Sequence, residues 1–143
     1  MRSRPIIAID GPAGAGKSST ARRLAERLGL RFLDTGALYR AVTLAALRRG
    51  LDPGDEQAVS ALAAAVRIEL DATCEPPRVL LDGEDVSDDI RGPRVTNAVS
   101  TVAALPGVRT AMIPRQREFA VGGGVVAEGR DIGTVVFPDA DLK

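Results

Sequence analysis

The feature that most constrains this chain is the run GPAGAGKS at residues 11–18, which fits the pattern Gly, four residues, Gly-Lys-Ser/Thr. Residues 6–10 before it are apolar and β-branched, as in a buried parallel strand. After it, apolar residues recur at helical spacing as far as Gly29, which predicts a helix over 17–29. A strand, a glycine loop and a helix in this order bind polyphosphate, because the loop amides and the helix N-terminus point at the anion.

The alternative is a flexible glycine turn that carries a solvated lysine. The composition argues against it, because 17 of the 19 basic residues are arginine and the only lysines are Lys17 and Lys143. Lys17 therefore falls where a compact, strongly hydrated ammonium suits a phosphate. We predict a nucleoside triphosphate site, with Lys17 reaching the β- and γ-phosphates.

Composition narrows the remaining classes. A length of 143 residues suits about one domain, and a formal net charge of zero gives no support for a nucleic-acid or membrane partner. There is no histidine, so histidine-based acid–base chemistry and metal ligation are excluded. The single Cys74 is expected to be an ordinary thiol and suits a reducing compartment. No apolar run approaches the length of a membrane span, and we expect a cytoplasmic protein.

Alternating periodicities predict the architecture. Strands are expected at 5–10, 31–34 and 125–127, and helices at 17–29, 35–50, 55–66, 93–104 and 107–120. Residues 67–71, 78–81 and 84–86 alternate with a period near two, with the hairpin signal Asp82-Gly83 among them. We predict an α/β fold of the P-loop NTPase type, with a parallel sheet flanked by helices and a small antiparallel and helical insert. The predicted core is 1–50 with 121–143, and the insert is 51–120.

A second group of polar residues could face a second, smaller anion: Thr35, Arg40, Ser100, Arg109 and Arg130. Arg40 lies on a helix that starts at the carboxyl edge of the sheet, and Arg130 directly follows the third strand. Two guanidinium groups at strand ends suit a monophosphate acceptor, because each binds phosphate bidentately. The alternative for any one arginine is a solvated surface charge, which is the expectation for Arg22, Arg23, Arg48 and Arg49. Three roles remain open for Asp131: a contact to the base, an outer carboxylate of a magnesium site, or a turn cap.

These motifs resemble the bacterial-type cytidylate kinase family, which transfers phosphate from ATP to CMP and dCMP. The matching strings are IDGPAGAGKSS (9–19), LDTGALYR (33–40), GEDVS (83–87), NAVS (97–100), VR (108–109) and EGRDIGTVVFPD (128–139). The match covers nearly the whole chain, and its second and last strings are more specific than the phosphate loop. The antiparallel insert corresponds to the CMP-binding insert of that family.

The resemblance implies roles for individual residues. Lys17 and Arg130 would be catalytic, Arg40 and Arg130 would hold the CMP phosphate, and Ser18 would be the protein ligand of Mg²⁺. Contacts to the nucleoside would come from Thr35, Ser100, Arg109 and Asp131. The residues implied to bind the ATP phosphates are Gly11, Pro12, Ala13, Gly14, Ala15, Gly16, Lys17, Ser18 and Ser19. The implied partners are the small molecules CMP and dCMP, and the full-length enzyme would be a monomer.

The chain departs from the family pattern in two places. Pro114 falls inside a predicted helix, where proline costs about 3 kcal/mol unless the helix kinks. Residues 139–143 resemble the start of a fourth parallel strand, which in the family leads to an arginine-bearing lid. We expect this length of chain to be inactive alone and to associate, with one side of the third strand unpaired.

Two other functions remain open. One is a different small-molecule kinase on the same fold, acting on AMP or shikimate, although the Gly-Arg-Asp string and the insert argue against it. The other is a non-catalytic nucleotide-binding module. A GTPase is disfavoured because the chain has no Asn-Lys-x-Asp motif.

Overall fold

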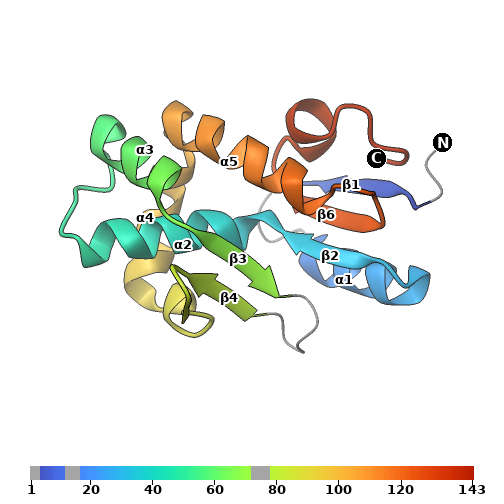
Figure 1. Cartoon of the computed structure of the whole chain (residues 1–143), viewed down its shortest axis with the longest axis horizontal. Helices are drawn as coiled ribbons and strands as arrows, with labels where there is room; N and C mark the ends of the chain where they lie inside the picture. Colours follow the sequence, from blue (N-terminus) through green and yellow to red (C-terminus); the bar gives the residue numbers. More distant parts are fainter. Residues whose placement is uncertain (1–3, 12–16, 72–77) are drawn as a thin grey trace. The chain divides into compact units, whose positions relative to one another are not determined.

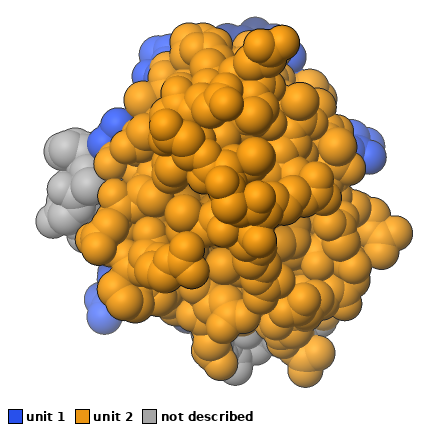
Figure 2. All heavy atoms as spheres, turned by 90° about the vertical axis from the view of Figure 1, so that its left-hand side faces the viewer, with its two compact units in different colours: residues 1–36, 115–143 blue, residues 37–114 orange. Residues whose placement is uncertain are grey.

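The computed structural model describes residues 4–11, 17–71 and 78–143, which leaves Cys74 outside the described part (Figure 1). The chain divides into two compact units, coloured separately in Figure 2. Unit 1 is Met1–Gly36 with Arg115–Lys143, and unit 2 is Ala37–Pro114. The boundaries fall inside helices α2 (Thr35–Arg48) and α5 (Pro106–Phe119), whereas the sequence pattern placed the insert at 51–120.

Unit 1 is built on a parallel sheet in the order β1-β6-β2. Its strands and first helix are β1 (Ile6–Asp10), β2 (Arg31–Asp34), β6 (Val125–Gly129) and α1 (Lys17–Leu28). Ile7 and Phe32 both pair in register with Val126, and all three are buried in one cluster with Ala21 and Ala25 of α1. Helix α1 therefore covers this face of the sheet, and the predicted α/β class is confirmed.

The end of the chain adds to the edge of this sheet. Leu142 forms a parallel bridge with Ile7, and its carbonyl accepts the N–H of Ala8 at 2.9 Å. The expectation that the third strand would be left unpaired was wrong, because β6 is the central strand with a parallel partner on each side. Strand order in a parallel sheet is set by crossover connections, so the order of strands along the chain does not reveal it.

Unit 2 contains an antiparallel sheet in the order β3-β4-β5. Its strands are β3 (Ile68–Asp71), β4 (Arg78–Leu81) and β5 (Glu84–Asp85). The predicted hairpin turn is confirmed: Asp82 has φ 49° and Gly83 has φ 88°. Two consecutive positive φ angles are what a type I′ turn requires, and its twist matches that of the flanking strands.

Helices of unit 2 bury one continuous apolar cluster. Three helices lie wholly in this unit: α3 (Glu56–Ala65), η1 (Asp89–Arg91) and α4 (Pro93–Ala103). The unit also contains most of α2 and the first part of α5. Val42, Val59, Val102 and Met112 in this cluster are fully buried. Pro114 lies inside α5, which continues to Phe119. No helix among the described residues is long and apolar enough to cross a membrane.

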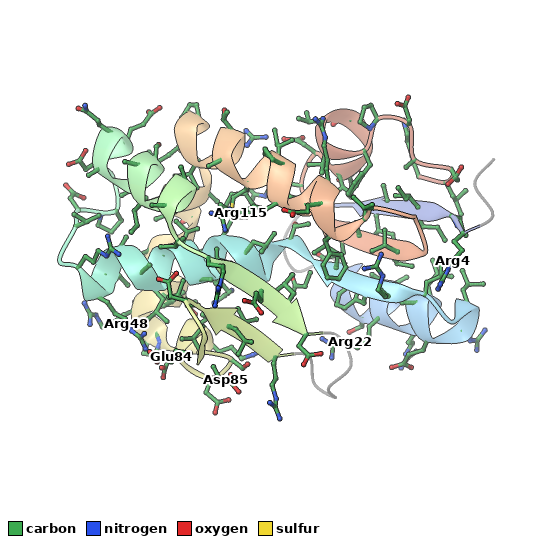
Figure 3. The ribbon with its side chains drawn as sticks, viewed as in Figure 1. Arg4, Arg22, Arg48, Glu84, Asp85 and Arg115 are labelled. Carbon is green, nitrogen blue, oxygen red and sulfur yellow. The ribbon has the colours of Figure 1, made fainter. Side chains whose placement is uncertain are left out.

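One surface arginine of unit 2 is more than a solvated charge. Arg48 Nη2 lies 3.0 Å from carboxylate oxygens of both Glu84 and Asp89, and Figure 3 shows Arg48 and Glu84 pointing toward one another. The hydrogen bond with Glu84 raises the pKa of the Arg48 guanidinium. The expectation of a solvated surface charge at Arg48 is confirmed, since 40% of the side chain is exposed, and the two ion pairs give this charge local partners.

Candidate nucleotide site

The first part of the candidate site is the corner between β1 and α1. Strand β1 ends at Asp10, and α1 begins at Lys17. Residues 12–16 and the side chains of Lys17 and Ser18 lie outside the described part, so their roles remain predictions. Helix α1 has no acidic residue in its first turn. Its N-terminal amides and the positive end of its dipole are therefore not neutralised from within the helix, which suits an anion.

The second part is the turn that follows β6. Strand β6 is buried along its whole length, whereas Arg130 and Asp131 directly after it are exposed. Asp131 adopts the left-handed conformation with φ 55°, and a short π-helical turn, η2 (Ile132–Val136), begins after it. The charged side chains of the Gly-Arg-Asp string thus emerge at the carboxyl edge of the sheet, beside the end of β1.

The side chain of Thr35, the first residue of α2, connects this helix to the end of β6 through a hydrogen bond. It is 2% exposed, and its hydroxyl donates to the carbonyl of Glu128 at 2.9 Å. A Cβ at Gly129 would collide with that hydroxyl, so β6 and the start of α2 approach closely only because residue 129 is glycine. Thr35 begins the helix as expected, and in addition its side chain fixes the end of β6.

Sequence reasoning missed Glu128 as a site residue. It is 4% exposed, and in register it lies between Ile9 of β1 and Asp34 of β2. Since alternate residues of a strand share a face, Glu128 lies on the face of Val126, which α1 covers. A single acidic residue near the end of an apolar strand was the available signal, because a carboxylate is costly to bury and is then often functional.

Asp10 was also missed. Its Oδ1 accepts the N–H of Ile132 at 2.6 Å, and its Oδ2 accepts the N–H of Gly133 at 2.9 Å. The end of β1, which precedes the glycine loop, is therefore bonded directly to the turn that follows Arg130. No local pattern could reveal this contact, because 122 residues separate Asp10 from Ile132.

In unit 2, Arg40 is held against η1 and α4. Its Nη1 donates to the carbonyl of Ile90 at 3.0 Å and to Oγ1 of Thr96 at 3.1 Å. Ser100 follows Thr96 by one helical turn, so the two lie on the same face of α4. The structure thus brings Arg40 to the face of α4 that carries Ser100. Arg109 is exposed on α5.

The predicted acceptor residues therefore form two groups. Thr35, Arg130 and Asp131 lie in unit 1, around the carboxyl end of β6. Arg40, Ser100 and Arg109 lie in unit 2. Each group by itself contains guanidinium and hydroxyl groups that suit a phosphorylated ligand. The described residues contain no group of three metal-ligating side chains.

A parallel sheet whose first strand and first helix flank a glycine loop defines an α/β protein of the P-loop kinase class. The sequence profile of the family described as Cytidylate kinase matches residues 7–143. The chain belongs to the cytidylate kinase family.

Curated relatives agree with this assignment. A protein named cytidylate kinase from Pelotomaculum thermopropionicum is 56% identical over 100% of this chain and 64% of its own length. Relatives with the same name from Mycolicibacterium paratuberculosis and Solibacter usitatus are 56% and 54% identical, over 100% and 99% of this chain. The chain spans 63% and 60% of the lengths of these two.

Proposed function

We propose that this chain carries the donor site and part of the acceptor site of a kinase that phosphorylates CMP and dCMP with ATP. The strongest supporting observation is the similarity to proteins named cytidylate kinase, which are 56% identical over the whole of this chain. The acceptor residues taken from the motifs also occupy strand ends and helix faces that can reach a ligand. A non-catalytic nucleotide-binding module and another small-molecule kinase are the alternatives.

The donor ATP would bind at the β1–α1 corner. The backbone N–H groups of residues 11–19 other than Pro12 would hold its phosphates, and Lys17 would neutralise the charge on the β- and γ-phosphates. Ser18 and the buried carboxylate of Glu128 offer the oxygen ligands that Mg²⁺ prefers, and Mg²⁺ needs few protein ligands when phosphates supply the others. When bound, Mg²⁺ neutralises charge on the phosphates of the nucleotide.

The acceptor CMP would be held by its phosphate and read by its base. Arg40 and Arg130 would bind the phosphate, and Ser100 with Arg109 would contact the cytosine edge. Arg40 retains donors on Nε and Nη2, which make no hydrogen bond with the described residues. A guanidinium fixed through one nitrogen loses little entropy when its other nitrogens bind an anion. Thr35 and Asp131 would contact the nucleoside.

The reaction itself needs positioning and charge neutralisation. A phosphate oxygen of CMP would attack the γ-phosphorus of ATP in line, the bond to the bridging oxygen would break, and CDP and ADP would form. Lys17 and Arg130 would stabilise the negative charge on the transferring group. No side chain has to form a covalent intermediate.

The test is an ATP-dependent coupled assay of the protein at its natural full length, with CMP, dCMP, UMP, AMP and shikimate as acceptors. The proposal predicts preferred turnover of CMP and dCMP. Preferred turnover of AMP or shikimate would support another kinase of this fold. Binding of ATP without turnover of any acceptor would support the non-catalytic module.

We also propose that residues 1–143 do not phosphorylate CMP by themselves. The relatives are longer, and the resemblance implies that their additional part holds a lid whose arginines reach the transferring phosphate. Such arginines are worth about 10³–10⁵ in rate in related phosphoryl transfers. Purified residues 1–143 should show no ATP-dependent turnover above background. Robust turnover by a monodisperse preparation would contradict this proposal.

A further inference from the structure

The short turn η2 is tied to the end of β1 by a single carboxylate. Asp10 accepts the first two backbone N–H groups of η2, those of Ile132 and Gly133, with one oxygen each. Bonds to an ionised acceptor are roughly twice as strong as neutral ones. A Cβ at residue 133 would stand 3.2 Å from Asp10 Oδ2, so a side chain there would require the carboxylate to shift by a few tenths of an ångström.

The other end of η2 is held by an arginine of α5. Arg117 Nε donates to the carbonyl of Val136 at 2.9 Å, and its Nη2 donates to the carbonyl of Val135 at 3.0 Å. A carboxylate at the start of a helical turn and a guanidinium at its end both complement the dipole of that turn. Two residues distant in sequence thus fix η2 from both ends.

These contacts determine where the preceding residues lie. Arg130 is exposed, yet the buried end of β6 precedes it and the anchored η2 follows one residue later. The left-handed conformation of Asp131 is maintained between these two fixed segments. The backbone that carries Arg130 therefore has its position set by Asp10, the last residue of β1.

We propose that Asp10 is a positioning residue that couples the start of the ATP phosphate loop to the turn that carries Arg130. Asp10 would act through Arg130: its carboxylate places the guanidinium where the acceptor phosphate binds, in fixed relation to the donor loop. This inference rests on the proposed function of Arg130. Arg117 supports the same turn from its other end.

The test is a double-mutant cycle with Asp10→Asn and Arg130→Ala in the protein at its natural full length. The readouts are the affinities for CMP and for cytidine, which lacks the phosphate. Asp10→Asn should weaken CMP binding by about ten- to a hundredfold, the loss expected when the hydrogen bonds of Arg130 to a charged phosphate are no longer made. In the Arg130→Ala background the same change should cost less than about twofold, because coupled residues are not additive. Cytidine affinity should fall much less than CMP affinity, because of the displaced residues only Asp131 would contact the nucleoside.

Two further measurements separate positioning from a general loss of structure. Hydrogen exchange at the amides of Ile132 and Gly133 should accelerate in Asp10→Asn and stay unchanged in Arg130→Ala. Asp52→Asn is the matched control, because Asp52 also accepts a backbone N–H, that of Gly54 at 2.9 Å. It should leave CMP affinity unchanged. Arg117→Ala should also weaken CMP binding more than cytidine binding, by a smaller factor than Asp10→Asn. If Asp10→Asn does not fold, the Arg117→Ala variant tests whether the anchoring of η2 positions Arg130.

The outcomes are distinct. If Arg130→Ala alone leaves CMP affinity unchanged, the proposed acceptor site fails and this inference fails with it. If Arg130→Ala weakens CMP binding but the effect of Asp10→Asn is absent or fully additive, only the coupling is overturned. An equal loss of cytidine and CMP affinity in Asp10→Asn would also overturn it, since that result indicates a general structural role.

Discussion

The two units hold their candidate site residues in different ways. In unit 1, Arg130 and Asp131 occupy a turn after a strand, and hydrogen bonds from Thr35 to Glu128 and from η2 to Asp10 fix the backbone on either side. In unit 2, Arg40 and Ser100 project from regular helices, and the buried apolar cluster sets the positions of those helices. Single polar contacts therefore fix the backbone of the site in unit 1. In unit 2 packing fixes the helices, and the hydrogen bonds from Arg40 to Ile90 and Thr96 orient its side chain.

This difference predicts how each unit responds to substitution. Removing one polar group in unit 1 should change ligand binding with little effect on folding. Removing apolar volume in unit 2 should mainly lower the free energy of unfolding, because each methylene removed from a close-packed cluster loses contacts and leaves a cavity. The predictions below test this contrast, starting with the largest expected effect.

Lys17→Ala should lower phosphoryl transfer by about 10²–10³-fold and leave the fold intact, because the lost interaction is with the charge of the transferring group. Turnover and circular dichroism of the full-length protein are measured together. Lys143→Ala is the matched control, as the only other lysine within residues 1–143, and should retain turnover. More than a tenth of the wild-type turnover in Lys17→Ala would contradict the assignment.

Met112→Ala should destabilise the protein by about 2–5 kcal/mol, since Met112 is fully buried in the cluster of unit 2. Denaturant unfolding gives the difference in free energy. Val121→Ala is the control: Val121 is 75% exposed, and its truncation should change little. Equal stability of the two variants would show that this cluster does not determine the stability of unit 2.

Arg130→Ala should weaken binding of CMP and UMP alike by about 1.5–3 kcal/mol, the usual range for hydrogen bonds to charged groups. Isothermal titration of both nucleotides gives the two losses. The control is Arg27→Ala, which removes an exposed arginine from the last turn of α1. A loss confined to CMP would indicate that Arg130 contacts the base and would refute the phosphate assignment.

Ser100→Ala should narrow the preference for CMP over UMP by about 1 kcal/mol, the typical worth of one neutral hydrogen bond. Thr101→Ala, the next residue on α4, removes a hydroxyl from a different face of the helix and should leave the preference unchanged. Competition titrations with both nucleotides measure the ratio. An unchanged ratio in Ser100→Ala would remove Ser100 from base recognition.

Sequence reasoning succeeded where the signal is local. The strand before the glycine loop, the Asp82-Gly83 hairpin and the helix predicted at 55–66, which is α3, all follow from adjacent residues. It could not place β6 at the centre of the sheet, because strand order depends on how the chain crosses over between strands. The π-helical turn after Asp131 was not predicted either, since its supports at Asp10 and Arg117 are distant in sequence.

The same contrast applies to the candidate site. Arg40 and Arg130 could be selected because both fall in recognisable motifs, Arg130 directly after a strand and Arg40 on a helix that starts at the carboxyl edge of the sheet. Asp10 and Glu128 could not, because their significance lies in a long-range hydrogen bond and in burial between two other strands. Residues in local motifs can be selected from the sequence, whereas residues whose partners or neighbours are distant in sequence are revealed by the fold.

The most direct test of the account is amide chemical-shift mapping of the full-length protein with ATP alone and with CMP alone. The account predicts that, within residues 1–143, ATP causes its largest shifts in unit 1, at the start of α1, Asp10 and the first residues of η2. CMP should cause its largest shifts both around Arg130 in unit 1 and around Arg40 and Ser100 in unit 2. Largest CMP shifts confined to one unit, or largest ATP shifts on α4, would contradict it.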